Sequence, residues 1–255
     1  MRLIINCLLF LFPSLCYSQV LTCAPIFPYQ NDSIVLTYNA SLGNGELTGV
    51  SPVFAHTGLI YGASNNWQNV QGNWGTADSS VLMQSLGNDL HSISFHIPSY
   101  YGISGTSSSG PNALAFVFRN NSGTLVGRNS DQSDIYVPIY SSSSPLEVRW
   151  AGAKNVLEVL PNSTITLHAG SSIAADFDVI LNGSLVFTDS NTRSITPTLT
   201  IPNSLGVHYL VVQANQGAQS VSDTLILAVN NAVGANQDVI IIPAYPTTGY
   251  NQRNL

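Results

Sequence analysis

The chain has 255 residues, of which 44% are hydrophobic and only 8% are charged. Seven Lys and Arg residues, scattered along the sequence, stand against thirteen Asp and Glu residues, and the formal net charge is −6. Because a nucleic-acid binder needs clustered cations to displace counterions from phosphates, this composition argues against a nucleic-acid partner and suits neutral ligands such as polysaccharides.

The first 18 residues have the pattern of a secretory signal peptide. Arg2 supplies the positive charge, an apolar run follows at 3–12, and the small residues Cys16 and Ser18 precede the expected cleavage site. The run is shorter than the roughly 20 residues that a membrane-spanning helix needs. We therefore expect an exported protein, secreted or at the outer cell surface, with no transmembrane segment. Acylation at Cys16 or Cys23 is an alternative that would tether the chain.

Apolar residues alternate with polar ones through the first half, which predicts β-strands. The alternation covers 34–38, 93–97 and 135–139, and the run 113–118 is apolar throughout, as a central sandwich strand should be. Gly87-Asn88-Asp89 predicts a hairpin between two of these segments. The segment 62–78, rich in Gly, Ser, Asn and Gln, has the composition of a loop.

The second half continues the same pattern. Ile195, Leu199 and Ile201 alternate with threonines, and the runs 207–212 and 225–229 have the composition of buried strands. Asn182-Gly183 is a strong hairpin signal, because a type I′ turn needs positive φ at both central residues.

These elements predict an all-β chain of two consecutive β-sandwich modules, immunoglobulin-like in strand count, after the signal peptide. The serine-rich stretch 141–145 buries nothing and marks the boundary. We therefore expect a signal peptide at 1–18, a carbohydrate-binding-like sandwich at 24–140, an immunoglobulin-like sandwich at 146–230, and an irregular tail or linker at 231–255.

Several segments of 33–140 match, in order, the N-terminal accessory module of exported bacterial α-amylase-family glycoside hydrolases (glycoside hydrolase family 13). They are TYNASLGNGEL from Thr37, VFAHTGLI from Val53, the spaced Trp67 and Trp74, VLMQSLGNDLHSISF from Val81, YYGI, ALAFVFRNNSG and DIYVPIY. Residues 146–230 resemble, with less specific motifs, the immunoglobulin-like module that follows in such enzymes. The resemblance implies a non-catalytic region that precedes a catalytic barrel. That barrel is absent from this chain, so glycosidase activity is not carried over.

The candidate binding residues are His56, Tyr61, Trp67, Trp74, Tyr100 and Tyr101. Sugar binding needs flat apolar faces for the C–H side of the ring and polar edges for the hydroxyls, and aromatic residues in a polar loop supply both. The resemblance adds that a histidine beside a tryptophan can bond sugar hydroxyls. The alternative is that both tryptophans plug the ends of the sandwich and that His56 bonds only to backbone.

Other polar groups receive simpler interpretations. His91, His96, His168 and His208 are expected at the surface. Asp131 and Asp134 lack the spacing of a calcium loop and are expected in a solvated turn.

Asp176 and Asp178 share one strand face, and solvation explains them more simply than catalysis. No nucleophile elbow, catalytic residue, metal site or cofactor motif is predicted, and Cys23 has no matched base.

The sequence therefore favours an accessory pair of modules that binds or presents a starch-type α-glucan. The competing hypothesis is a purely structural spacer with no affinity for sugar.

Overall fold

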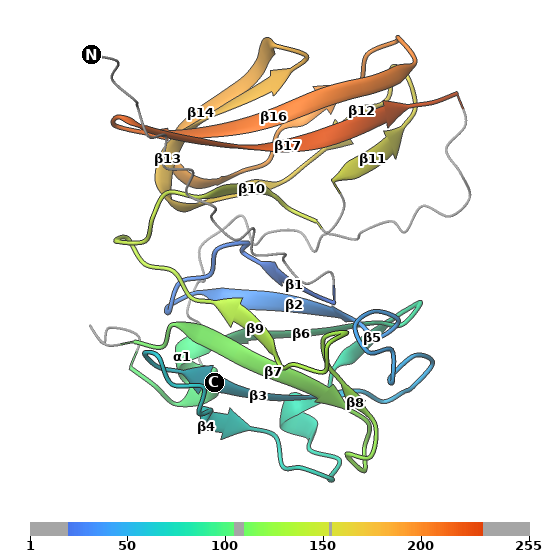
Figure 1. The fold of residues 1–255 in the computed structure, drawn as a ribbon, viewed down its shortest axis with the longest axis vertical. Coiled ribbons are helices and arrows are strands. Elements are labelled where there is room, and N and C mark those ends of the chain that lie inside the picture. Colours follow the sequence, from blue (N-terminus) through green and yellow to red (C-terminus); the bar gives the residue numbers. More distant parts are fainter. Residues whose placement is uncertain (1–19, 105–109, 153–154, 232–255) are drawn as a thin grey trace, which may run out of the picture.

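The computed structural model describes residues 20–104, 110–152 and 155–231. Within these ranges the strands form two groups of sheets that share no strand pairing (Figure 1). The expected signal peptide at 1–18 and the expected tail beyond Asn231 lie outside the described residues. No helix in the described ranges is both long and apolar enough to cross a membrane.

The first group is a sandwich of two antiparallel sheets. One sheet contains, in spatial order, β1 (Leu21–Ala24), β2 (Ser33–Asn39), β6 (Leu90–His96) and β5 (Gln84–Gly87). The other contains β4 (Gln68–Gln71), β3 (Phe54–Ile60), β7 (Ala113–Arg119) and β8 (Val126–Gly127), with β9 (Ile135–Pro138) also paired to β7. A 3-10 helix, η1 (Ser79–Val81), and a short helix, α1 (Ile97–Tyr101), complete it.

The predicted alternation explains how the first core forms. Ile34, Leu36 and Tyr38 of β2 are buried from one sheet. Phe116 and Phe118 of β7 are buried from the other. Tyr38 stacks on Phe118 with ring centroids 3.9 Å apart. Each such side chain contributes roughly 1.5–3 kcal/mol of hydrophobic stabilisation, and this holds the two sheets face to face.

The strand predicted through 93–97 ends one residue early. β6 stops at His96, and Ile97 begins helix α1 with Pro98 in its first turn. Proline has no N–H for a strand ladder, but it is tolerated at a helix start. Ile97 is nevertheless fully buried, so the alternation identified the correct face but the wrong element.

The second group has eight strands in the described residues. They are β10 (Val148–Trp150), β11 (Val156–Val159), β12 (Thr164–Thr166), β13 (Ala169–Leu181), β14 (Ser184–Ile195), β15 (Thr198–Thr200), β16 (Gly206–Gln216) and β17 (Gln219–Val229). The main sheet has the order β10-β13-β16-β17-β11, with β14 paired to β13, and β12 pairs with β15 separately. The predicted Asn182-Gly183 hairpin joins β13 to β14, with φ values of 51° and 84°.

The expectation that 207–212 is buried throughout is wrong. Val207 and Tyr209 are 59% and 55% exposed, whereas His208, Leu210 and Val212 are buried. An antiparallel sheet with one face on the core and the other toward solvent produces this alternation. The second core lies on the inner side of the sheet and includes Phe177 and Leu227.

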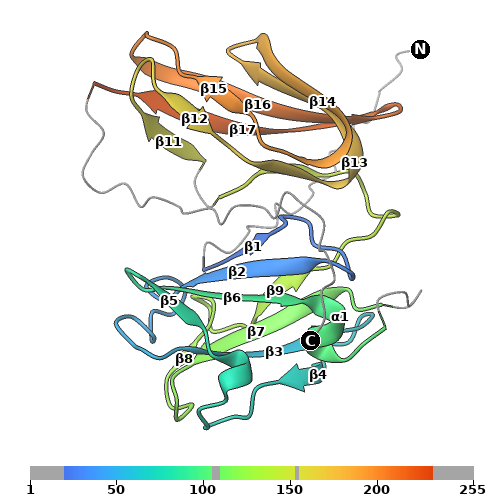
Figure 2. The same cartoon turned by 180° about the vertical axis from the view of Figure 1, so that it is seen from behind.

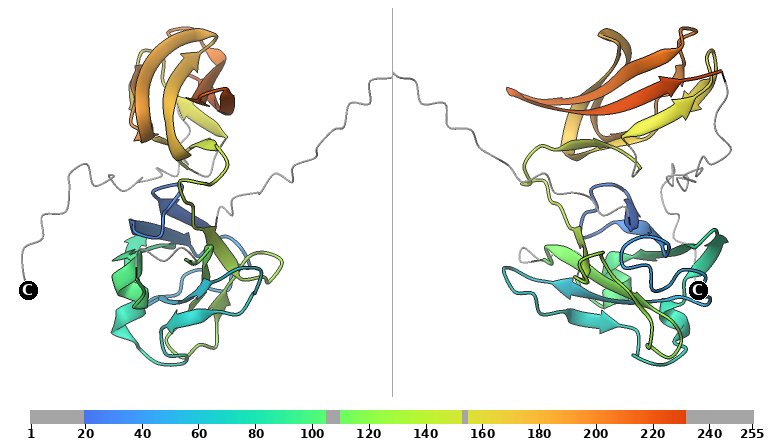
Figure 3. Two further views of the ribbon diagram at one scale, coloured as in Figure 1. Left: turned by 90° about the vertical axis from the view of Figure 1, so that its left-hand side faces the viewer. Right: turned by 45° about the vertical axis from the view of Figure 1, so that its right-hand side comes forward.

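The two sandwiches are stacked one above the other along the long axis of the molecule, as the view from behind in Figure 2 and the side views in Figure 3 also show. β9 and β10 flank the segment 141–145 and belong to different sandwiches. A small apolar cluster of Ile26, Phe27 and Tyr140, with Tyr29 and Ala151 packed on it, lies between the two large cores. The chain therefore has an all-β architecture of two sandwiches.

Candidate functional site

The candidate site lies on the outer face of the β4-β3-β7-β8 sheet. Along β3, Ala55 and Leu59 face the core of the sandwich. His56 and Gly58, which alternate with them, therefore face outward. Val117 and Ala115 of β7 lie directly opposite these two residues in the antiparallel register and share the outer face.

The two tryptophans flank the edge strand beside β3. Trp67 directly precedes β4, and Trp74 follows it. The expectation of an uninterrupted loop over 62–78 is wrong here, because Gln68 and Gln71 of β4 pair with Leu59 and Thr57 of β3. This pairing holds the backbone next to both indoles in a defined position.

His56 lies between the two indoles. Its ring stacks on Trp67 with centroids 5.8 Å apart and an interplanar angle of 27°. It also meets Trp74 edge to face, with centroids 5.2 Å apart and an angle of 87°. The structure thus brings three of the six predicted residues into one aromatic group, and the two indole planes are steeply inclined to each other.

Each indole packs against the backbone of a glycine residue. A Cβ atom on Gly58 would lie 3.1 Å from the Cβ atom of Trp67, and one on Gly123 would lie 2.6 Å from Nε1 of Trp74. Trp67 is half-buried, and Trp74 is 48% exposed. Neither indole is part of the apolar core of the first sandwich. Each is packed from below and open to solvent in part.

The protonation of His56 follows from its contacts. Its Nδ1 lies 2.9 Å from the carbonyl oxygen of Gly72. A carbonyl only accepts, so Nδ1 carries the proton and donates. Partial burial lowers the pKa of His56, more than the Gly72 hydrogen bond raises it. The imidazole is therefore neutral near pH 7, and its Nε2 is an acceptor.

Arg119 is a residue of this face that the sequence analysis missed. It lies opposite Phe54 in the register, with its guanidinium carbon 5.1 Å from the Phe54 ring centre and 6.0 Å from that of Trp74. Its Nη2 donates to the carbonyl of Asn73 at 2.7 Å. Burial lowers the pKa of Arg119. The side chain is fully buried, so it supports the Trp74 loop from beneath. Its place at the end of the apolar run 113–118 is the only signal in the sequence.

The three predicted tyrosines lie elsewhere. Tyr101 is 2% exposed, and its hydroxyl lies 2.6 Å from that of Thr57, so it is a core residue closed to a surface ligand. Tyr100 is half-buried and stacks on Phe95 with centroids 3.9 Å apart. Its burial raises the pKa to about 12. Tyr61 is also half-buried and packs against the first core. None of the three has a ring contact with His56 or the tryptophans.

Two of the histidines expected at the surface are buried. His91 lies in the first sandwich with neither ring nitrogen hydrogen-bonded. His208 accepts from Asn182 and donates to the carbonyl of Ser204. Each lies at a position of an alternating strand that faces the core. The position in the strand, and not the polarity of the side chain, therefore determines its burial. His96 is exposed as expected, and His168 is half-buried.

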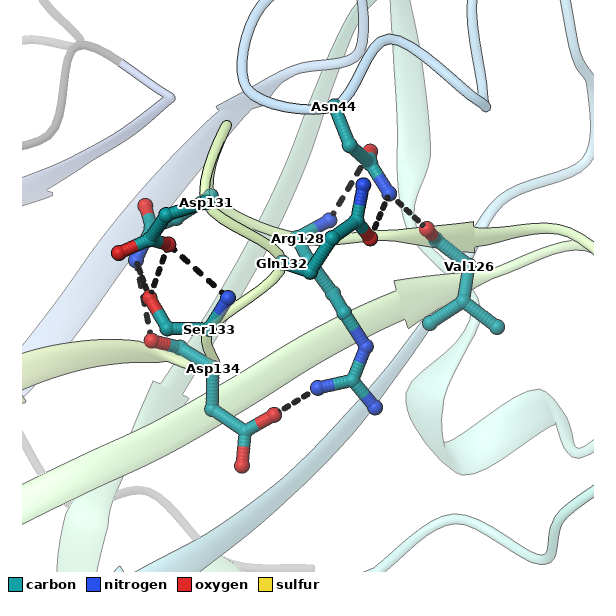
Figure 4. A network of polar contacts seen from close by, with 8 residues as sticks. Asn44, Val126, Arg128, Asp131, Gln132, Ser133 and Asp134 are labelled. Atoms are coloured by element: carbon teal, nitrogen blue, oxygen red, sulfur yellow. Dashed lines mark hydrogen bonds and ion pairs between the residues drawn. The ribbon is translucent and has the colours of Figure 1, made fainter.

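The loop that carries Asp131 and Asp134 is closed by internal contacts (Figure 4). Asp131 accepts from the backbone N–H and the hydroxyl of Ser133, and Asp134 pairs with Arg128. Among the described residues, no group of three or more His, Cys, Asp or Glu side chains is placed to hold a metal ion. The carboxylates of this loop are therefore engaged in holding the turn.

The two aspartates of β13 are also engaged, and the thiol of Cys23 is protonated. Asp176 accepts from the backbone N–H of Asn191, and Asp178 accepts from the side chain of Asn215. Cys23, on β1, has a pKa raised by burial, which keeps the thiol protonated.

Comparisons with known proteins identify no family. No protein-family model and no curated protein matches the chain. Among solved structures, the fibronectin(III)-like modules of CbhA from Clostridium thermocellum match at 16% identity over 32% of this chain and 95% of that chain, with a TM-score of 0.27. An FMN-binding beta-glucuronidase from Facaelibacterium prausnitzii matches at 18% identity over 46% of this chain and 18% of that chain, with a TM-score of 0.32. The titin Ig tandem domains A164-A165 match at 10% identity over 80% of this chain and 91% of that chain, with a TM-score of 0.27. These TM-scores are too low for any function to be inferred from the matches. The sandwich architecture is established by the strand pairing described above.

Proposed function

We propose that the first sandwich binds a neutral glycan of the starch type on the surface formed by His56, Trp67 and Trp74. The observation that carries the proposal is the neutral imidazole held between two partly open indoles. The indoles offer apolar faces to the C–H side of a sugar ring, and their N–H groups donate. Nε2 of His56 accepts from a hydroxyl. This combination of groups matches an uncharged polyol.

The inclination of the two indoles favours a curved ligand. Two coplanar rings would suit an extended, flat polysaccharide. The steep angle between Trp67 and Trp74 presents two differently oriented faces, which fits a helically coiled α-glucan better than a flat chain. The resemblance of 33–140 to accessory modules of exported α-amylase-family enzymes points to the same ligand class. In this proposal the chain is a non-catalytic binding region of such a secreted enzyme.

Native electrophoresis in gels containing soluble starch tests the proposal. We expect the starch to retard the full chain, and the double variant Trp67→Ala/Trp74→Ala to migrate as it does without starch. Tyr209→Ala is the matched control, because it removes an exposed aromatic side chain from the other sandwich. Absence of retardation for the unmodified chain would refute starch binding.

A rigid spacer is the second candidate function, and the contacts between the sandwiches favour it. The hydroxyl of Tyr29 donates to the carbonyl of Ser172 at 2.8 Å, and Arg193 donates to the carbonyl of Phe27 at 2.7 Å. These bonds fix one sandwich relative to the other. A spacer function predicts no response of tryptophan fluorescence to added maltooligosaccharides, whereas the binding function predicts quenching or a spectral shift.

A further inference from the structure

A fourth aromatic residue lies on the same outer face as the proposed site. Tyr136 is on β9 between Ile135 and Val137, whose side chains are buried in the first core. Tyr136 itself is 44% exposed. It lies directly opposite Ala115 of β7, which in turn lies opposite Gly58 of β3. Because directly opposed residues of antiparallel strands share a face, Tyr136 stands on the outer face of the sheet.

The spacing of the strands sets the distance between Tyr136 and the other aromatic residues. Neighbouring strands lie about 4.8 Å apart, so the backbone of Tyr136 is about 10 Å from that of Gly58. The side chain of Trp67 packs on Gly58, with 3.1 Å between the Trp67 Cβ atom and the position of a Cβ on Gly58. Between Trp67 and Tyr136 the sheet therefore carries only the hydrogen of Gly58 and the methyl group of Ala115. Ala115 is fully buried and Gly58 is buried as well, so neighbouring side chains cover this strip, and Tyr136 and Trp67 present partly exposed rings on either side of it.

The charges beside Tyr136 are balanced. Asp134, two residues before it, pairs with Arg128 (Figure 4). The strip itself consists of apolar side chains and backbone. A ligand that spans from Tyr136 to Trp67 meets aromatic faces and no net charge, which favours a neutral sugar chain over a polyanion.

We infer that Tyr136 is a further ligand-contacting residue, and that the ligand is a linear neutral oligosaccharide of more than two sugar units. Its chain crosses strands β9, β7 and β3 from Tyr136 to Trp67 and His56. The phenol ring stacks on one sugar unit while the indole of Trp67 stacks on another. This inference rests on the proposed function and extends it from a single subsite to a chain-length requirement.

Calorimetric titration with maltose and with maltoheptaose tests the inference on the full chain. We expect Tyr136→Ala to weaken maltoheptaose binding by about 2- to 10-fold, the range typical of one aromatic contact, and to leave maltose binding unchanged. Tyr136→Phe keeps the ring and is expected to bind maltoheptaose as the unmodified chain does. Trp67→Ala should weaken the binding of both sugars. Tyr209→Ala, an exposed tyrosine on a strand of the other sandwich, should change neither affinity.

The outcomes separate the two proposals. If Trp67→Ala weakens binding but Tyr136→Ala binds maltoheptaose as well as the unmodified chain, the inference about Tyr136 fails and the proposed function stands. Equal affinity of the unmodified chain for maltose and maltoheptaose overturns the chain-length requirement. Failure of the unmodified chain to bind either sugar overturns both proposals. Thermal unfolding of each variant establishes that lost affinity does not reflect lost folding.

Discussion

At the scale of single residues, His91 is a polar side chain in surroundings that offer it neither water nor a hydrogen-bond partner. It is 3% exposed, and both ring nitrogens lack a hydrogen-bond partner. Tyr38, its partner across β2 and β6, also has a buried hydroxyl without a hydrogen bond, and the ring centroids are 6.4 Å apart. Burial lowers the pKa of His91, and the nearby Asp89 raises it by a smaller amount. The imidazole therefore stays neutral in the folded chain at a pH where the unfolded chain is protonated.

The lowered pKa of His91 predicts a loss of stability in mild acid. Above about pH 6.5 the imidazole is neutral in both states and contributes no pH dependence. As the pH falls below that value, the unfolded chain binds the proton first, so the free energy of unfolding decreases until the folded-state pKa is reached. In His91→Leu, the free energy of unfolding should decrease less between pH 7 and pH 5. At pH 7 the substitution should leave the free energy of unfolding unchanged or raise it, because an unsatisfied buried polar group costs about 1–3 kcal/mol. Urea unfolding at pH 5, 6 and 7 measures both effects.

His96→Leu is the control for this prediction, because His96 lies on the same strand but is exposed. The loss of stability in acid of His91→Leu is compared with that of this variant. An unfolding free energy that decreases equally between pH 7 and pH 5 in His91→Leu and in the unmodified chain would contradict the account of His91.

The residues of the site could be predicted only in part from the sequence. A histidine in an alternating run and two tryptophans in a polar segment indicated a binding group, and His56, Trp67 and Trp74 do lie together. Tyr101 could not be excluded, because nothing local shows that its hydroxyl meets Thr57, 44 positions earlier. Tyr136 was readable from its place between inward-facing Ile135 and Val137, but its neighbours follow from the register of β3, β7 and β9.

At the scale of elements, the position of edge strand β4 depends on a glycine in β3. Gly58 is buried, and a Cβ atom there would lie 3.1 Å from both the Trp67 Cβ atom and the backbone oxygen of Gln68. Contacts this short force one partner to move. The absence of a side chain at Gly58 thus allows β4 and the indole of Trp67 to lie against the sheet.

Gly58→Val should displace Trp67 and destabilise the first sandwich. Overpacking of a well-filled site costs about 1–3 kcal/mol, and the released indole should emit at longer wavelength because it meets more water. Gly58→Ala should give a smaller change in the same direction. Guanidinium unfolding and tryptophan emission spectra measure the two effects. Unchanged emission in Gly58→Val would show that Trp67 does not rest on this glycine.

Alternation predicted most strands correctly, whereas the edge strand β4, which has a single aliphatic residue, was missed. Ile34, Leu36 and Tyr38 face the core as expected, because a period of two directs every second side chain to one side. The strand β4, with the sequence QNVQ, has one apolar residue and forms through backbone pairing with β3. Such an edge strand is fixed by tertiary contacts, which local composition does not reveal.

At the scale of the whole molecule, a polar junction connects the sandwiches. Besides its bond to the carbonyl of Phe27, the guanidinium of Arg193 lies 3.4 Å from the centre of the Tyr29 ring and 3.3 Å from a carboxylate oxygen of Asp32. Arg149 lies 5.1 Å from the centre of the Phe27 ring. These contacts join residues more than 100 positions apart, so no local pattern in the sequence predicts them. Most of these contacts are made by Arg193 of β14, so this one residue helps to set the orientation of the two sandwiches.

Arg193→Ala should loosen the junction without unfolding either sandwich. The lost hydrogen bond, cation–π contact and half-exposed ion pair together contribute about 1–2 kcal/mol, with the ion pair the smallest part because water screens it. Small-angle scattering should show a larger radius of gyration, and thermal unfolding should separate into two transitions. Arg128→Ala is the matched control, because its ion pair with Asp134 has the same side-chain exposures, 31% and 26%, but lies within the first sandwich. If the scattering curves of Arg193→Ala and the unmodified chain coincide, the apolar cluster around Phe27 and Tyr140 is sufficient to hold the junction, and Arg193 does not set the orientation of the sandwiches.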